Sequence, residues 1–152
     1  MAYNRLPPTL WRCAIPGFRL IQHTADTGFI AYGADMRELF ANAARALFSI
    51  VTDVKTIRAA EKRTITAEAV DREALLVAWL NEFIFLFDSE QRLFSRFDVR
   101  AVSKTKVRAV VYGERAEPSR HPIKTGLKSA TYHQLKITKG PKGYRARLIL
   151  DV

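Results

Sequence analysis

The sequence contains a single cysteine, Cys13, and no long apolar run. A lone cysteine cannot form a disulfide within the chain, so the fold must be stable without this crosslink. The longest apolar segment is interrupted by Asn81, Glu82 and Asp88, which excludes a membrane-spanning helix there. The N-terminus has no charged leader followed by an apolar stretch and a small-residue cleavage site. We therefore expect a cytoplasmic protein with no membrane partner.

The short motifs that accompany common enzyme chemistry are also missing. The sequence has no Gly-x-Ser-x-Gly elbow for a nucleophilic serine, no Gly-x-x-x-x-Gly-Lys-Ser/Thr phosphate loop and no Gly-x-Gly-x-x-Gly dinucleotide motif. Cys13 lies in a proline-containing segment with no base nearby in the sequence, so it lacks the partner that activates a thiol. We expect a protein that is not an enzyme on its own.

Acidic residues are few relative to basic ones. The chain has 15 Asp plus Glu against 25 Lys plus Arg, which gives a formal net charge of +10. This balance suits a polyanionic partner, but the basic residues are spread along the chain, and net charge by itself defines no site. No zinc-ligand spacing, aromatic RNA-binding strand or arginine-rich recognition helix is visible. Proximity to nucleic acid and a merely solvated basic surface therefore both stay open.

Length and composition predict one globular domain. The 152 residues are 48% hydrophobic and 26% charged, as is usual for a folded domain. A chain of this length buries roughly 70% of the surface that its unfolded form exposes, which is enough for one core. We expect a single domain over 17–152, preceded by an irregular arm over 1–16 that contains Pro7, Pro8 and Pro16.

Caps, periodicity and turn residues mark the expected elements. Asp35 and Glu38 form a capping box, and the apolar residues that follow recur at helical spacing. Asp71 caps a second helix whose apolar stripe is so wide that it must be covered almost entirely. Residues 139–143 have the composition of a tight turn. Strands are predicted over 18–23, 29–32, 64–70, 93–102, 107–112, 130–138 and 144–151.

This order of elements describes an α+β fold. Two helices are followed by strands that short turns connect, which favours antiparallel pairing. The expected architecture is a largely antiparallel β-sheet with a pair of α-helices packed on one face, in a single domain.

Two short polar segments lie among small residues and are candidates for a site. The first contains His23 and Asp26, and the second contains Lys128 and His133. Each has an ordinary explanation: Asp26 precedes Thr27 and Gly28 as a turn former would, a lysine is usually a solvated charge, and a lone histidine is more often hydrogen-bonded than a ligand. The residues alone do not decide between these readings.

The end of the sequence adds a group of carboxylates. Asp151 is followed by Val152, whose α-carboxylate would be a second anion within one residue. If Asp26 lies near them, three carboxylates share one space. Two carboxylates 4 Å apart repel by about 4 kcal/mol at an effective dielectric constant of 20, so this group would bind a cation or a proton. Oxygen ligands favour a divalent metal ion such as calcium, magnesium or manganese.

The order and spacing of these segments resemble the archease family. The resemblance covers 18–152 and leaves out the N-terminal arm. It is carried by 23–26, 31–33, 38–44, 75–82 and 85–88, and then by His121, Lys124, Thr125, Lys128, 131–133, Asp151 and Val152.

The resemblance implies a function in RNA repair. Archeases are accessory proteins of the RtcB-type RNA ligase, which joins a 3′-phosphate or 2′,3′-cyclic phosphate end to a 5′-hydroxyl in tRNA splicing. Such a protein promotes guanylylation of the ligase by GTP and allows multiple turnover, so tRNA or other broken RNA and GTP are met through the ligase. By the same resemblance the metal ligands are Asp26, Asp151 and Val152, and the residues that act on the ligase are Lys128, His23 and His133.

Two other functions stay open from the sequence. One is an RNA-binding or chaperone-like module for tRNA-processing enzymes, in which the acids near the end of the chain are structural. The other is a metal-dependent hydrolase that acts without a partner.

Overall fold

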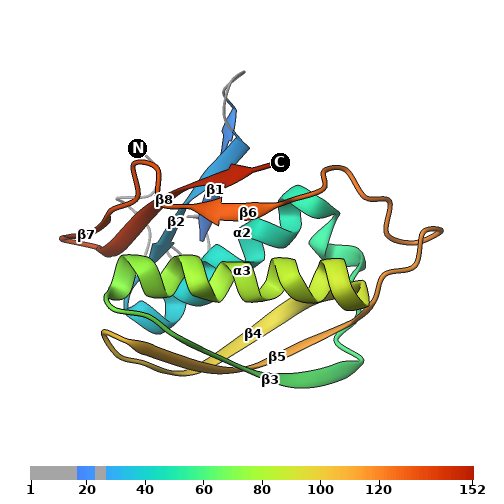
Figure 1. Ribbon diagram of the computed structural model, residues 1–152, viewed down its shortest axis with the longest axis horizontal. Helices are drawn as coiled ribbons and strands as arrows, with labels where there is room; N and C mark the ends of the chain where they lie inside the picture. Colours follow the sequence, from blue (N-terminus) through green and yellow to red (C-terminus); the bar gives the residue numbers. More distant parts are fainter. Residues whose placement is uncertain (1–16, 23–26) are drawn as a thin grey trace, which may run out of the picture.

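The computed structural model describes residues 17–22 and 27–152. The expected arm over 1–16 and the candidates His23 and Asp26 lie outside the described residues. The elements in chain order are β1 (Phe18–Gln22), β2 (Thr27–Gly33), α2 (Met36–Val51), the 3-10 turn η2 (Val54–Thr56), β3 (Glu61–Glu68), α3 (Arg72–Glu90), β4 (Arg92–Val102), β5 (Lys106–Arg115), β6 (Ser129–Thr131), β7 (Ile137–Gly140) and β8 (Gly143–Asp151) (Figure 1).

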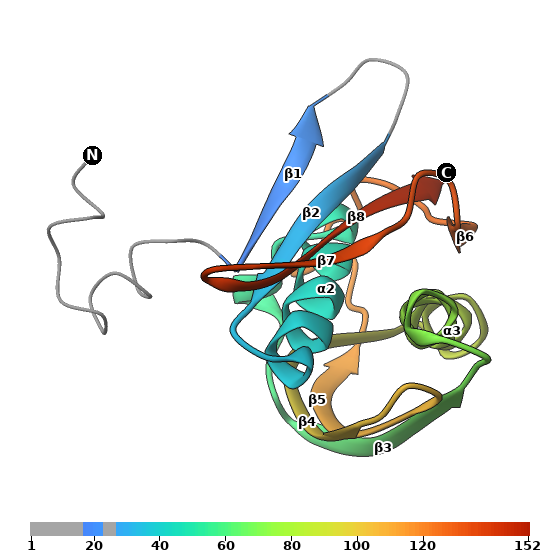
Figure 2. The same cartoon turned by 90° about the vertical axis from the view of Figure 1, so that its left-hand side faces the viewer.

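The strands divide into two antiparallel sheets. One has the order β1-β2-β8-β6, with β7 also paired to β8, and the other has the order β3-β5-β4. The two helices lie between these sheets: α2 contacts both β2 and β4, and α3 contacts both β6 and β3 (Figures 1 and 2). The α+β class and the antiparallel pairing are confirmed. The strands form two sheets where one was expected, and each sheet packs one of its faces on the helix pair, which is therefore covered from both sides.

The composition of α3 explains the second sheet. Its buried side chains include Leu75, Leu76 and Val77 in succession, which project from the helix in different directions. A helix that is apolar on most of its circumference must be buried on most of it. One sheet covers a single side, so the second sheet completes the burial.

The predicted caps begin both helices. The Asp35 carboxylate accepts a hydrogen bond from the backbone N–H of Glu38 (2.9 Å), and the Asp71 carboxylate accepts one from the N–H of Ala74 (2.8 Å). The Glu38 carboxylate accepts from the N–H of Ala34 (2.9 Å), one residue before the cap. The capping box is therefore present in a form that reaches one residue further back.

The segment predicted as one strand over 130–138 forms two short strands. Both β6 and β7 pair with the same edge of β8, opposite 149–151 and 143–146 respectively, and residues 132–136 leave the sheet between them. Gln134 has a left-handed backbone (φ 55°), and the N–H of Leu135 donates to the carbonyl of Tyr132 (3.0 Å). This turn interrupts the predicted strand where the apolar alternation shifts from Ala130 and Tyr132 to Leu135 and Ile137.

The turn between β7 and β8 follows the prediction. Gly140 pairs with Gly143, so only Pro141 and Lys142 lie between the paired ends of the hairpin. Gly143 has a φ of +124°, a conformation that residues with a side chain rarely adopt.

Aromatic rings form the centre of the core. Phe83 of α3 is fully buried. The centre of its ring lies 4.7 Å from the ring centre of Trp79 and 5.7 Å from that of Phe48 on α2. The ring centres of Phe94 and Phe97 on β4 are 5.6 Å and 5.5 Å away. This group of rings joins both helices to the three-stranded sheet. Neither helix of the described ranges has the combined length and apolarity needed to cross a membrane.

Substitution Phe83→Ala is expected to lower the free energy of unfolding by about 3–5 kcal/mol, because it leaves a cavity that four neighbouring rings border. Phe85 lies on the same helix but is 61% exposed, so Phe85→Ala should change stability by no more than about 0.5 kcal/mol. Urea denaturation of both variants measures the difference. Similar losses in the two variants would contradict this description of the core.

Candidate functional site

One corner of the five-stranded sheet brings together several of the residues singled out from the sequence. Thr27, at the start of β2, pairs with Leu150, and Ser129, at the start of β6, pairs with Asp151. The N–H of Lys128 donates to the carbonyl of Asp151 (2.8 Å). Lys128 and Asp151 are thus neighbours across two strands although 22 residues separate them in the sequence.

The side chains at this corner are open to solvent. Lys128, Asp151 and Val152 are all exposed, and no ion pair of Lys128 or Asp151 occurs within the described ranges. Both charges are therefore available to a ligand or a partner protein. His23 and Asp26 lie outside the described residues, so their place in the site stays a prediction.

His133 lies on the 132–136 loop, beyond the opposite end of β6 from Lys128. Its N–H donates to the hydroxyl of Thr131 (3.3 Å), which in turn donates to the carbonyl of Ile149 (3.0 Å). The imidazole is exposed. The structure therefore places His133 on the same edge of the sheet as Lys128, with β6 between them.

Carboxylates do not gather into a metal site among the described residues alone. No group of three or more His, Cys, Asp and Glu side chains that could hold a metal ion occurs within 17–22 and 27–152. The metal site expected from the sequence needs Asp26, which precedes Thr27. Its other proposed ligands, Asp151 and Val152, supply oxygen donors of the kind that hard cations prefer.

Helix α3 holds the edge strands through two polar side chains that the sequence reasoning left without a role. The amide oxygen of Asn81 accepts from the N–H of Ala130 (2.7 Å) in β6, and the carboxylate of Glu73 accepts from the N–H of Ile137 (3.1 Å) in β7. Asn81 thus holds β6 at Ala130, two residues after Lys128. The signal in the sequence was a polar residue within an otherwise apolar helix stripe.

A buried polar cluster fixes the long connection that leads from β5 to Lys128. His121 is fully buried, and its Nδ1 accepts from the N–H of Glu117 (2.9 Å). The proton therefore lies on Nε2, which faces Glu114 Oε2 (3.0 Å) and the carbonyl of Thr56 (3.1 Å). Glu114 also accepts from both terminal nitrogens of Arg120 (2.8 and 3.2 Å). His121 belongs to the segments that carry the resemblance, and here its role is to anchor the chain.

The connection is also attached to the end of α2. The hydroxyl of Thr52 donates to the carbonyl of Pro122 (2.9 Å), and the N–H of Lys124 donates to the carbonyl of Val51 (2.7 Å). These bonds and the buried cluster replace the regular secondary structure that residues 116–128 lack. They set where Leu127, which is buried, and Lys128, which is exposed, enter β6.

Glu114 is charged in this cluster. Burial alone would raise the pKa of its carboxyl, but the N–H of Arg58, the guanidinium of Arg120 and the ring of His121 outweigh burial and hold that pKa below its ordinary value. A carboxyl with a lowered pKa in the folded state stabilises the fold above its unfolded pKa. This contribution is lost as the pH falls through the lower, folded-state pKa.

Substitution Glu114→Gln should lower the free energy of unfolding by about 2 kcal/mol near neutral pH, because hydrogen bonds to a charged group are replaced by weaker ones. The difference between the variant and the parent protein should shrink as the pH falls below about 4 and vanish once Glu114 is protonated in both states. Glu117→Gln, which removes an exposed carboxylate from the same segment, is the control. A difference that is independent of pH would show that charge is not the cause.

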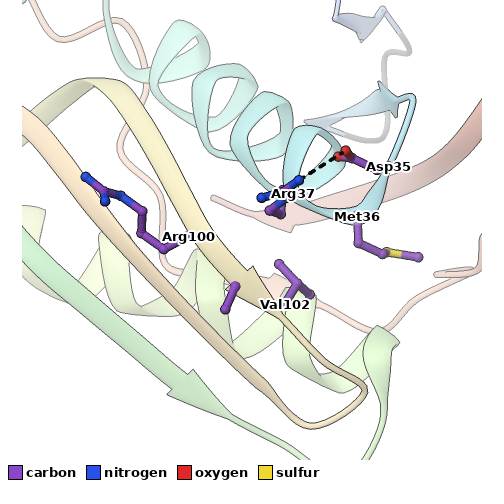
Figure 3. A pocket seen from close by; sticks show the side chains of 6 residues that line it. Asp35, Met36, Arg37, Arg100 and Val102 are labelled. Carbon is purple, nitrogen blue, oxygen red and sulfur yellow. Dashed lines mark ion pairs between the residues drawn. The ribbon is translucent and has the colours of Figure 1, made fainter.

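A shallow depression at the start of α2 is separate from this corner (Figure 3). Its rim includes the exposed pair Asp35 and Arg37, whose charged atoms are 4.0 Å apart, and Arg100 of β4, which forms an ion pair with Asp98 (2.9 Å). Both arginines already have acidic partners. The depression therefore offers no unpaired charge for an anionic ligand.

Comparison with known proteins identifies relatives over almost the whole chain. The model of the archease protein family matches residues 18–152. The protein archease of Methanosarcina mazei is 33% identical over an alignment of 139 residues that covers 89% of this chain and 95% of the relative. That of Methanothermobacter thermautotrophicus is 37% identical over an alignment of the same length, which covers 90% of this chain and 99% of the relative.

Solved structures agree with these sequence matches. The solution structure of Methanobacterium thermoautotrophicum protein 1598 has a TM-score of 0.78 at 37% identity and covers 91% of this chain and 100% of its own. The crystal structure of a Thermotoga maritima archease, described as a possible chaperone, has a TM-score of 0.58 at 22% identity over 87% of this chain and shares the fold. The chain therefore belongs to the archease family.

Proposed function

We propose that this protein is a non-enzymatic accessory protein of an RtcB-type RNA ligase. In this role it promotes GTP-dependent guanylylation of the ligase and its multiple turnover, and it meets tRNA or other broken RNA through the ligase in the cytoplasm. Membership of the archease family supports the proposal. The observation that carries it is the juxtaposition of Lys128 with Asp151 at an open corner of the sheet.

The proposal includes a divalent cation bound by Asp26, Asp151 and Val152. Asp26 directly precedes Thr27 in the sequence, and Asp151 directly follows Leu150. Thr27 of β2 and Leu150 of β8 are paired across the two strands. The donors of Asp151 and Val152 fit a hard cation because they are carboxylate oxygens. No basic side chain of the described residues forms an ion pair with them. When bound, such an ion would supply positive charge to an acidic or phosphate group of the ligase complex.

Lys128 has a different task in the proposal. An ammonium group has three donors and no acceptor, so it cannot bind a cation while it is charged. Its exposure next to Asp151 suits contact with a phosphate or with a carboxylate of the ligase. His23 and His133 are proposed to assist the same contact.

Asp151→Asn and Asp26→Asn should each weaken divalent-cation binding and the stimulation of ligase guanylylation, because affinity in such sites follows the number of charged ligands. Calorimetric titration with calcium, magnesium and manganese measures the binding, and transfer of labelled GMP to the ligase measures the stimulation. Glu117→Gln, which removes an acid away from this corner, should change neither. Unchanged metal affinity in both aspartate variants would eliminate this metal site.

Lys128→Gln should leave the metal affinity within a factor of about two and abolish most of the stimulation, since the lysine is not a ligand. Lys136→Gln removes an exposed lysine from the neighbouring loop and should retain stimulation. Both variants need the same melting temperature as the parent protein. Full stimulation by Lys128→Gln would assign Lys128 to the solvated surface.

A further inference from the structure

The outer face of the three-stranded sheet has a distribution of charge that the proposed ligase site does not use. The inner face of this sheet packs on the helices through buried residues such as Ile65, Val107 and Val111. No element of the described ranges covers its outer face, which forms one outside layer of the molecule (Figure 2). The helix layer separates this face from the corner that holds Lys128 and Asp151 (Figure 1).

Strand register arranges the outward side chains in rows. Tyr112 of the central strand β5 has Lys62 of β3 on one side and Arg96 of β4 on the other. Four residues back along β5, Arg108 lies on the same face between Thr66 and Ala101. Four strand residues span about 13 Å, and strands two apart are separated by about 10 Å. Three cations therefore cover an area of that size.

These three cations have no acidic partners among the residues that the structure describes. Asp98 and Glu68 of the outer face are already paired, Asp98 with Arg100 (2.9 Å) and Glu68 with Lys106 (3.1 Å). Lys62, Arg96 and Arg108 form no ion pair with any residue of the described ranges. The face therefore has a net positive charge that an external polyanion would neutralise.

Tyr112 adds a stacking surface among these charges. The guanidinium of Arg96 lies 4.8 Å from the centre of the Tyr112 ring, as in a cation–π pair. Both groups are planar, and unpaired nucleobases stack on aromatic rings and on arginine guanidinium planes. An acidic peptide would use the charges of this face but would have no use for a planar stack.

We propose that the outer face of the β3-β5-β4 sheet binds single-stranded RNA, with Lys62, Arg96 and Arg108 on phosphates and the Tyr112–Arg96 pair under a base. A double helix keeps its bases stacked on one another and would gain from the cations alone. The proposal goes beyond the ligase role and gives the protein an RNA contact of its own. It can hold whether or not the protein stimulates a ligase.

The test is fluorescence anisotropy with a labelled oligouridine of about a dozen nucleotides, at salt concentrations from about 50 to about 200 mM, without ligase. The variant Lys62→Gln/Arg96→Gln/Arg108→Gln should bind at least about tenfold more weakly. The slope of log K against log salt should fall in magnitude by about two, because three phosphate contacts contribute about 0.7 each in a single strand. Circular dichroism and melting temperature confirm that the variant is folded.

A matched control removes three exposed cations from other surfaces: Arg19→Gln/Lys55→Gln/Lys136→Gln. This variant has the same net charge as the test variant and should keep the affinity of the parent protein within about threefold, since long-range attraction is screened at these salt concentrations. Equal weakening of both variants would overturn the proposal, because binding would then follow net charge and not this face.

Tyr112 separates stacking from charge. Tyr112→Phe should retain RNA affinity, whereas Tyr112→Ala should lose about tenfold or more, as expected for one stacked base. Two competitors test the specificity of the face: the same RNA as a duplex, and polyglutamate of matched charge. If either binds as strongly as the single-stranded oligouridine, the face binds polyanions in general and the single-stranded RNA site is rejected. If the variants of this face lose RNA binding but stimulate the ligase normally, the two functions are separate. If the protein binds RNA through this face but does not stimulate the ligase, the RNA site stands and the proposed ligase function fails.

Discussion

The fold depends on the burial of α3, a helix with too little polar surface to be covered from one side. Its side chains contact the three-stranded sheet below and β6 of the five-stranded sheet above. The rings around Phe83 connect it to α2 and β4. Both sheets are needed to remove this helix from water, so the two sheets and the two helices form one core.

The few polar groups of α3 that face the edge strands have specific partners. Asn81 and Glu73 accept hydrogen bonds from β6 and β7, the two strands that share one edge of β8. A buried backbone N–H without an acceptor is costly, so these side chains determine where the short strands can lie. Through β6 the apolar core thereby fixes the backbone at Lys128, next to Asp151.

The charges of the molecule are organised by its layers. Within the described part of the chain, the corner of the five-stranded sheet presents Lys128 and Asp151 without ion pairs, and the outer face of the three-stranded sheet presents unpaired cations on the other side of the helices. A net charge of +10 is compatible with many arrangements. Strand register selects this one, since it places Lys62 and Arg96 on either side of Tyr112.

Local interactions determined the features that were predictable from the sequence. The caps at Asp35 and Asp71, the apolar faces of both helices and the tight turn before Gly143 each depend on residues within a few positions of one another. The resemblance of ordered motifs likewise identified the family and named Lys128 and Asp151, but not their adjacency. The places of His23 and Asp26 remain predictions.

Pairings between distant strands were decided only by the tertiary structure. The division into two sheets follows from the burial of α3 on most of its circumference, and the break in the 130–138 segment follows from the hydrogen bonds that β8, Asn81 and Glu73 offer to it. Alternation in a sequence records which side chains share a face and not which strand lies beside them. The neighbours of Lys128 and of Tyr112 therefore came from the packing of the whole chain.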